Sequence, residues 1–86
     1  MAQTYSVQIT SYKFSPDPVD ISVGDTVEWT NAAVNMQHSA TSDDGKTFDS
    51  KLLDSGKKFA KTFDTAGTFP YHCTKHPGMK GTIIVK

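Results

Sequence analysis

The sequence predicts an all-β domain with little or no helix. Val, Ile and Thr together account for 21 of the 86 residues, whereas Leu occurs only twice. β-branched side chains lose rotamer freedom in a helix and pack well on a pleated sheet. Short runs that alternate between apolar and polar residues recur along the chain, with Gly, Pro and Asp between them, and this pattern favours a sandwich or barrel over βαβ units. A chain of this length is expected to form one domain over residues 1–86.

The first three predicted strands lie within residues 5–31. Residues 5–10 alternate between apolar and polar, as a half-buried strand does. Pro16 and Pro18 interrupt the pattern, because proline has no N–H to give to a sheet ladder. Residues 19–23 and 27–31 alternate again on the two sides of a Gly-Asp pair, and this arrangement predicts a hairpin.

The middle of the chain carries weaker signals. Residues 32–37 show no periodicity and are expected to form a loop, followed by a short strand over residues 38–41. The segment 42–57 is polar and contains two turn signals rich in Asp and Gly. Leu52 and Leu53 lie inside this segment, where we expect one helical turn.

Three further strands are predicted in the C-terminal part. In residues 59–63 the alternation is broken by Lys61, which either extends to solvent at a sheet edge or indicates a different register. In the next strand the side chains on one face, counted with a period of two, are those of Phe69, Tyr71 and Cys73. Residues 82–85 predict a buried final strand.

Composition excludes several classes of function. The nine lysines balance nine Asp and Glu, and there is no arginine, which disfavours a nucleic-acid partner. No run approaches the roughly 18 apolar residues of a membrane span, so we expect no membrane insertion, and no charged-then-apolar leader opens the sequence. Cys73 is the single cysteine, which excludes an internal disulfide and any structural zinc site that needs two thiolates.

Cys73 begins a motif that offers three metal-binding groups within one short loop. His76 and Met79 follow it at intervals of three residues. Thiolate and thioether are soft donors that select copper over hard cations. Blue copper sites use two His and one Cys in a nearly trigonal plane with a weak axial Met, so a second His is needed. His38 is the candidate, because His72 alternates away from Cys73 on its strand.

Each of these four residues alone has a plainer explanation, as a buried thiol, a loop or strand-end histidine, or a methionine that fills the core. Together, with this spacing after a predicted strand, they indicate one copper ion held by a set of four ligands: His38, Cys73, His76 and Met79. Such a site leaves no position open for a substrate, which argues against an enzyme.

Three stretches of the chain resemble a known family. They are residues 23–31, His38, and residues 66–74, followed by the loop in which Pro77 comes after His76. On these stretches the chain resembles the cupredoxins, the small blue copper proteins, and is most similar to their amicyanin and plastocyanin members; the loop has the amicyanin length.

The resemblance implies a Greek-key β-sandwich with copper at one end. It also implies a monomer that carries single electrons between Cu(II) and Cu(I), with larger redox proteins as donor and acceptor that dock at the His76 end. By the same analogy the compartment is the periplasm or another exported location.

Three residues depart from the family pattern. The residue after the first His ligand is usually Asn, which ties its strand to the residue after the Cys. Here it is Ser39, so the tie to Thr74 is expected to be shorter or absent and the site looser. Lys75 and Gly78 replace a Pro and a bulky apolar residue, which predicts a thinner apolar collar around His76.

Three rival functions remain open at this stage. A cysteine-dependent enzyme would use Cys73 with His76 or His38, but it needs an exposed thiolate and a substrate cleft. A copper carrier or storage domain usually holds Cu(I) with several Cys or Met in an accessible site. A zinc site is disfavoured because methionine is a poor zinc ligand.

Overall fold

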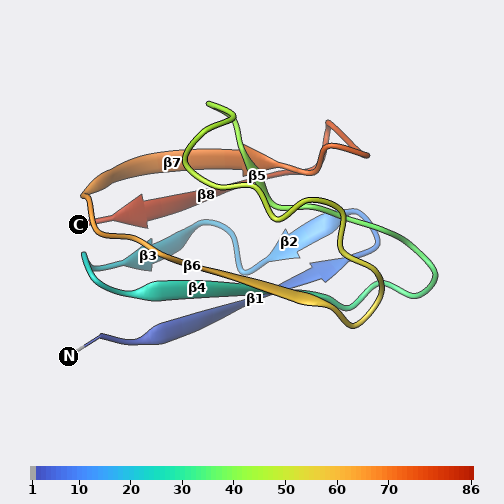
Figure 1. The fold of residues 1–86 in the computed structure, drawn as a ribbon, viewed down its shortest axis with the longest axis horizontal. Helices are drawn as coiled ribbons and strands as arrows, with labels where there is room; N and C mark the ends of the chain where they lie inside the picture. The colour runs from blue at the N-terminus through green and yellow to red at the C-terminus, as the bar shows by residue number, and fades with distance from the viewer. Residues whose placement is uncertain (1) are drawn as a thin grey trace.

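The computed structural model describes residues 2–86 and contains two four-stranded sheets that face each other (Figure 1). The strands are β1 (Thr4–Thr10), β2 (Lys13–Ser15), β3 (Val19–Ile21), β4 (Thr26–Asn31), β5 (Thr41–Ser42), β6 (Lys58–Thr62), β7 (Gly67–His72) and β8 (Lys80–Val85). Residues 2–86 form no helix, and so none that could cross a membrane. The prediction of an all-β sandwich is confirmed.

The sheet order explains how the two layers are built. The first sheet has the order β2-β1-β4-β6 and the second the order β3-β8-β7-β5. β1 and β4 run parallel, as do β3 and β8, while the other neighbouring strands are antiparallel. Each sheet turns one face inward, and the alternation of buried residues along β1, β4 and β8 follows the period of two that a pleated strand imposes.

The core between the sheets is rich in aromatic rings. Trp29 of β4 is fully buried and stacks on Phe48 with ring centroids 5.1 Å apart. Tyr71 of β7 meets Trp29 edge-on at 5.4 Å. Such offset and edge contacts are favourable for aromatic pairs beyond the area that they bury. This cluster packs the two sheets together along the middle of the sandwich.

The predicted hairpin on either side of Gly24 is wrong. β3 pairs with β8 in the second sheet, whereas β4 pairs with β1 and β6 in the first. The turn between them therefore crosses from one layer to the other, and Val23, expected to continue the buried alternation, is exposed. Alternation identifies which face of a strand is buried, but it does not identify the neighbouring strand.

Lys61 lies on β6, which is an edge strand of the first sheet. It is half-buried on the same side of the strand as Phe59, and its position in the ladder is opposite Val27. An edge position lets the lysine stem cover apolar surface while the ammonium group reaches water. The edge interpretation is therefore correct, and the register of this strand is as predicted.

The strand expected at residues 38–41 is shorter and begins later, because β5 contains only Thr41 and Ser42. His38 instead forms an isolated antiparallel bridge with Leu53. The N–H of His38 donates to the carbonyl of Leu53 at 3.2 Å, and the N–H of Leu53 donates back at 2.7 Å. The helical turn expected around Leu52 and Leu53 is wrong, since this exchange holds the segment extended.

β7 confirms the predicted shared face of the Cys73 strand. Tyr71 and Cys73 are fully buried and Phe69 is partly buried against the core. Gly81 lies opposite Tyr71 on β8, and a Cβ atom there would come within 2.6 Å of the tyrosine ring. β7 ends at His72, so Cys73 stands where the strand passes into the loop that precedes β8.

Candidate metal centre

The loop from Cys73 to Met79 is closed by its own backbone. The N–H of His76 donates to the carbonyl of Cys73 at 3.3 Å, and the N–H of Met79 donates to the carbonyl of His76 at 2.8 Å. The N–H of Cys73 then donates to the carbonyl of Met79 at 3.0 Å. Through these three bonds, each of Cys73, His76 and Met79 is hydrogen-bonded to the other two. Met79 is buried in the core cluster beneath the loop.

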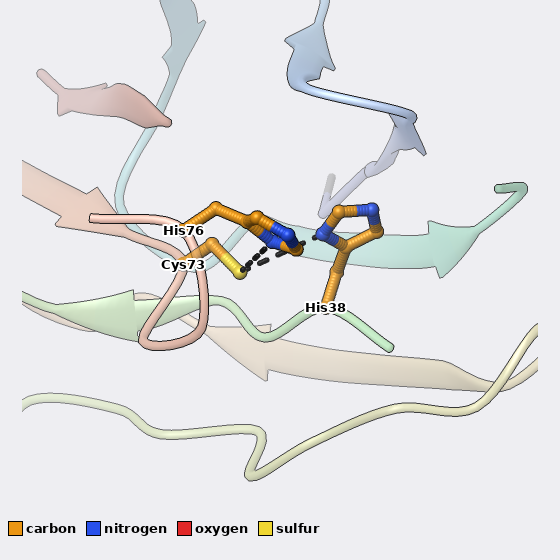
Figure 2. A group of neighbouring side chains, drawn as sticks. All are labelled: His38, Cys73 and His76. Carbon is orange, nitrogen blue, oxygen red and sulfur yellow. Dashed lines mark hydrogen bonds between the residues drawn. The ribbon is translucent and has the colours of Figure 1, made fainter. Parts of the chain in front are cut away.

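Three of the four predicted ligand residues converge in space. The Sγ atom of Cys73 lies 3.6 Å from Nδ1 of His38 and 3.7 Å from Nδ1 of His76. The three donor atoms all lie within 4.8 Å of one another, and Figure 2 shows both imidazoles directed at the sulfur. His38 and Cys73 are fully buried, while His76 is partly exposed.

The spacing of these atoms fits a metal site. A metal ion bound to imidazole nitrogen at about 2.0 Å and to thiolate sulfur at about 2.3 Å places these donors about 3.5 to 3.8 Å apart in trigonal or tetrahedral geometry. The two measured separations fall in this range. Two imidazoles and a thiolate, together with the buried Met79 that closes the same loop, are a donor set suited to copper.

Burial lowers the pKa of His38 below its ordinary value, and the neighbouring charges of His76 and Lys75 lower it further. Within the described residues Nε2 of His38 is buried without a hydrogen-bond partner, so nothing there stabilises a charged ring. Only the neutral imidazole binds a metal ion. The surroundings of His38 therefore favour the form that can act as a ligand.

Ser39 ties the two segments of the site together. Its hydroxyl oxygen accepts a hydrogen bond from the N–H of Thr74 at 2.9 Å and lies 3.0 Å from the hydroxyl of Thr74. Its own N–H donates to Sγ of Cys73 at 3.5 Å. An N–H donor stabilises negative charge on the sulfur. The tie to Thr74, expected to be shorter or absent, is present and consists of two short contacts.

Asn31, at the end of β4, is a residue of the site that the sequence analysis did not identify. Its fully buried amide group donates to the carbonyls of Met36 and Leu53, both at 2.8 Å, and accepts from the N–H of Ala33 at 3.0 Å. These bonds fix both ends of the loop before His38 and also the bridge partner of His38. The only signal in the sequence was a polar residue at an inward position of an alternating strand.

The outer edge of His76 is covered in part by Tyr12. This tyrosine lies in the turn between β1 and β2, and its ring meets that of His76 edge-on with centroids 5.3 Å apart. Tyr12 also lines a shallow pocket of about 410 Å³ together with Gly78 and Met79. Where Lys75 and Gly78 offer no apolar cover, an aromatic ring from a distant turn thus contributes to the collar.

His72 lies outside the cluster, as the alternation predicted. Its Nδ1 atom is 2.7 Å from a carboxylate oxygen of Asp43, on the other side of the strand from Cys73. The structure therefore brings His38, Cys73 and His76 together and leaves the third histidine on the surface.

Comparisons with known proteins agree with this geometry. The family described as copper binding proteins, plastocyanin/azurin family, matches residues 1–86. Amicyanin from Paracoccus versutus is 34% identical over 89 residues, which cover 99% of this chain and 67% of that protein. Plastocyanin from Scenedesmus fuscus is 35% identical over 85 residues, covering 85% of this chain and 86% of that one. The chain spans 63% of the length of a second amicyanin, from Paracoccus denitrificans.

Solved structures show the same fold. A purple cupredoxin from Nitrosopumilus maritimus superposes with a TM-score of 0.87 at 28% identity, over 95% of this chain and 99% of that one. A reduced mutant of amicyanin gives a TM-score of 0.87 at 28% identity, over 96% of this chain and 82% of that one.

Proposed function

The chain belongs to the plastocyanin/azurin family of copper-binding proteins, and on this basis we propose that it is a mononuclear blue copper protein that carries single electrons. Copper is its cofactor. The observation that carries the proposal is the convergence of two imidazole nitrogens on one buried thiol, at 3.6 and 3.7 Å. The bound ion supplies the one-electron couple between Cu(II) and Cu(I).

The proposed ligands are His38 and His76 through Nδ1, Cys73 through its thiolate, and Met79 as the weak axial donor. The support for Met79 is its place in the closed loop, where its backbone is bonded to both Cys73 and His76 and its side chain is buried. A thioether at this position tunes the reduction potential. We propose that residues 1–86 form one copper-binding domain, as the match to the family over these residues supports.

Rigidity of the ligands is what the protein contributes to electron transfer. His38 is held by the exchange of backbone bonds with Leu53, and the other ligands are held by the closed loop. Ser39 and Thr74 connect the two segments. A site fixed from both sides moves little when the metal changes oxidation state, and a small rearrangement allows fast electron transfer.

Electrons are proposed to enter and leave at His76, the ligand with solvent exposure. The proposed partners are larger redox proteins, one donor and one acceptor, which dock at this end of a monomeric protein. The family relationship supports an exported location such as the periplasm, because amicyanins and plastocyanins are exported proteins.

Two features favour an electron carrier over an enzyme or a copper storage domain. Cys73 has no exposed surface, so it is not accessible to a substrate as a nucleophile. It is also the only cysteine, whereas storage and transfer sites for Cu(I) use several sulfur donors in an open position. The buried site is suited to retaining its ion while the oxidation state changes.

The test is addition of Cu(II) to the purified protein, followed by optical and electron spin resonance spectra. The proposal expects an intense visible thiolate-to-copper band, a narrow copper hyperfine splitting and repeated one-electron cycling without loss of metal. Absence of the band in folded protein would refute it, and metal loss in each cycle would indicate a copper carrier instead. A Cys73→Ser variant is the matched control, because it removes the thiolate with little change in volume.

A further inference from the structure

Three hydroxyl groups form a continuous chain that leads away from the metal centre, two of them on the buried residues Ser39 and Thr41 and one on the exposed Thr74. Thr74 and Ser39 are 3.0 Å apart through their hydroxyl oxygens, and Ser39 and Thr41 are 3.1 Å apart. The hydroxyl of Thr41 donates to a carboxylate oxygen of Asp49 at 3.0 Å. The chain therefore begins one residue after Cys73 and ends at a charged group.

The direction of every proton in this chain follows from the chemistry of Asp49. An ionised carboxylate only accepts hydrogen bonds, and a hydroxyl has one proton to donate. Because Thr41 gives its proton to Asp49, Ser39 must donate to Thr41. Thr74 must then donate to Ser39, whose oxygen also accepts from the N–H of Thr74 at 2.9 Å. All the hydroxyl protons point from the metal centre toward Asp49.

Asp49 is itself held firmly in place. The same oxygen that receives Thr41 accepts the N–H of Lys51 at 2.8 Å, and Lys51 has a φ of 59°, a strained value for a side chain other than glycine. The neighbouring Ser50 is paired with Ala40: the N–H of Ala40 donates to the hydroxyl of Ser50 at 2.8 Å, and the N–H of Ser50 donates to the carbonyl of Ala40 at 3.0 Å. The N–H of Lys51, as the largest cause, and the hydroxyl of Thr41 lower the pKa of Asp49, so the carboxylate is ionised at neutral pH.

Hydrogen bonds in such a chain reinforce one another where they are shielded from water, as at the buried Ser39 and Thr41, and a bond to an ionised acceptor is stronger than a neutral one. The negative end at Asp49 makes the oxygen of Ser39 a better acceptor for Thr74. Ser39 follows His38 directly and donates its own N–H to the sulfur of Cys73. A stronger hydrogen bond at Ser39 therefore affects the positions of both His38 and Cys73.

We propose that Asp49 is a positioning residue of the metal centre, which acts through the hydroxyls of Thr41 and Ser39 to fix the His38 segment against the Cys73 strand and to set the reduction potential. This inference rests on the proposed function. Asp49 does not touch the donor atoms, and its influence depends on an unbroken chain.

The first experiment compares copper-loaded variants that break the chain at different points. Thr41→Val removes the middle hydroxyl and leaves the Asp49 charge in place, while Asp49→Asn removes the charge and keeps an acceptor oxygen. Because each variant interrupts the chain through which Asp49 acts on Ser39, both are expected to shift the reduction potential and the thiolate-to-copper band in the same direction. Thr41→Ser restores the hydroxyl and is expected to return both values toward those of the wild type.

Asp20→Asn is the matched control for charge, at an exposed site on β3. It is expected to leave the potential and the band unchanged. A shift with Asp49→Asn but none with Thr41→Val would overturn the proposal, because the effect would then be a simple interaction between charges. Unchanged values in both variants would overturn it as well.

The second experiment uses the metal-free protein and hydrogen exchange by NMR. Loss of a net hydrogen bond of about 1 kcal/mol corresponds to roughly a fivefold change, so the Thr74 amide is expected to exchange roughly fivefold faster in Thr41→Val than in the wild type. An unchanged exchange rate of the Thr74 amide would contradict the hydroxyl chain and overturn the proposal. If the wild type shows slow Thr74 exchange but no thiolate-to-copper band, the proposed function fails while the hydroxyl chain itself stands.

Discussion

The carbonyl of Leu53 is shared by Asn31 and His38: the side-chain amide of Asn31 donates to it at 2.8 Å and the backbone N–H of His38 at 3.2 Å. A residue at the end of β4 thus fixes the partner of a proposed ligand that lies several residues further along the chain. The other two bonds of Asn31 fix the loop between them, at Ala33 and Met36.

Asn31→Ala is expected to lower the free energy of unfolding of the metal-free protein by about 2–4 kcal/mol, because the N–H of Ala33 and the carbonyl of Met36 lose their partner and the carbonyl of Leu53 keeps only the bond from His38. Urea unfolding measures this difference. Gln37→Ala, in the same loop but with an exposed side-chain bond to Asp54, is the control and should stay within about 0.5 kcal/mol of the wild type. Equal stability of the two variants would contradict the role given to Asn31.

Ser39→Ala is expected to release copper faster than the wild type. The substitution removes the acceptor of the Thr74 N–H and both contacts that join the His38 segment to the Cys73 segment, at a cost of about 0.5–1.5 kcal/mol for each hydrogen bond. The measurement is the rate of metal transfer to a strong chelator. Ser39→Asn, which places the usual family residue here, is expected to retain copper better than the alanine variant. If all three proteins lose copper at one rate, Ser39 does not join the two segments.

Gly81→Ala is expected to destabilise the fold by about 1–3 kcal/mol, because the added Cβ would lie 2.6 Å from the buried ring of Tyr71. Gly78 is a matched control in the neighbouring loop, since a Cβ there meets no atom within 4 Å. Gly78→Ala should stay within about 0.5 kcal/mol of the wild type. Thermal unfolding of the two metal-free variants is the measurement, and equal midpoints would show that β7 can move away from β8.

Asp25 gives the fold an acid-sensitive contact. The N–H groups of Ser22 and Gln3 donate to its two oxygens, each at 2.9 Å, and hold the pKa of Asp25 below its ordinary value, Ser22 having the larger effect. Because the pKa of Asp25 is lower in the folded state, its ionised carboxylate stabilises the fold at pH values above the unfolded-state pKa of about 3.9. This stabilisation is lost as the pH falls through the folded-state pKa.

Asp25→Asn should therefore have a lower unfolding midpoint than the wild type at pH 5 to 7, with a difference that shrinks below about pH 4. Thermal unfolding of the metal-free protein over this range is the measurement. Asp20→Asn serves as the control for loss of an exposed carboxylate. A difference for Asp25→Asn that stays constant down to pH 2 would contradict the assignment.

Much of the fold follows from alternation in the sequence. It correctly predicted the inward face shared by Tyr71 and Cys73, and it left two explanations for Lys61, of which the edge position is correct. It failed for β3 and β4, which flank a turn signal but belong to different sheets, because the burial pattern of a strand is the same whichever neighbour it has.

Part of the candidate site could also be predicted from the sequence. Cys73, His76 and Met79 could be found from their spacing, because one short loop brings them together. The family resemblance pointed to Ser39 as the position of the tie to Thr74, which is stronger than expected. The contacts of Asn31 and Asp49 could not be found, since each depends on hydrogen bonds between segments that only the complete fold brings side by side.

The parallel pairing of β3 with β8 has a consequence for biosynthesis. Val19 lies beside Ile83, so β3 has no partner while most of the chain is still being translated. Contacts between distant parts of a sequence form late and slow the search for the native state. The segment from Cys73 to Met79 immediately precedes β8 and emerges from the ribosome with it. His38 is therefore made well before the three other proposed ligands, and the site cannot be complete until the loop that precedes β8 is present.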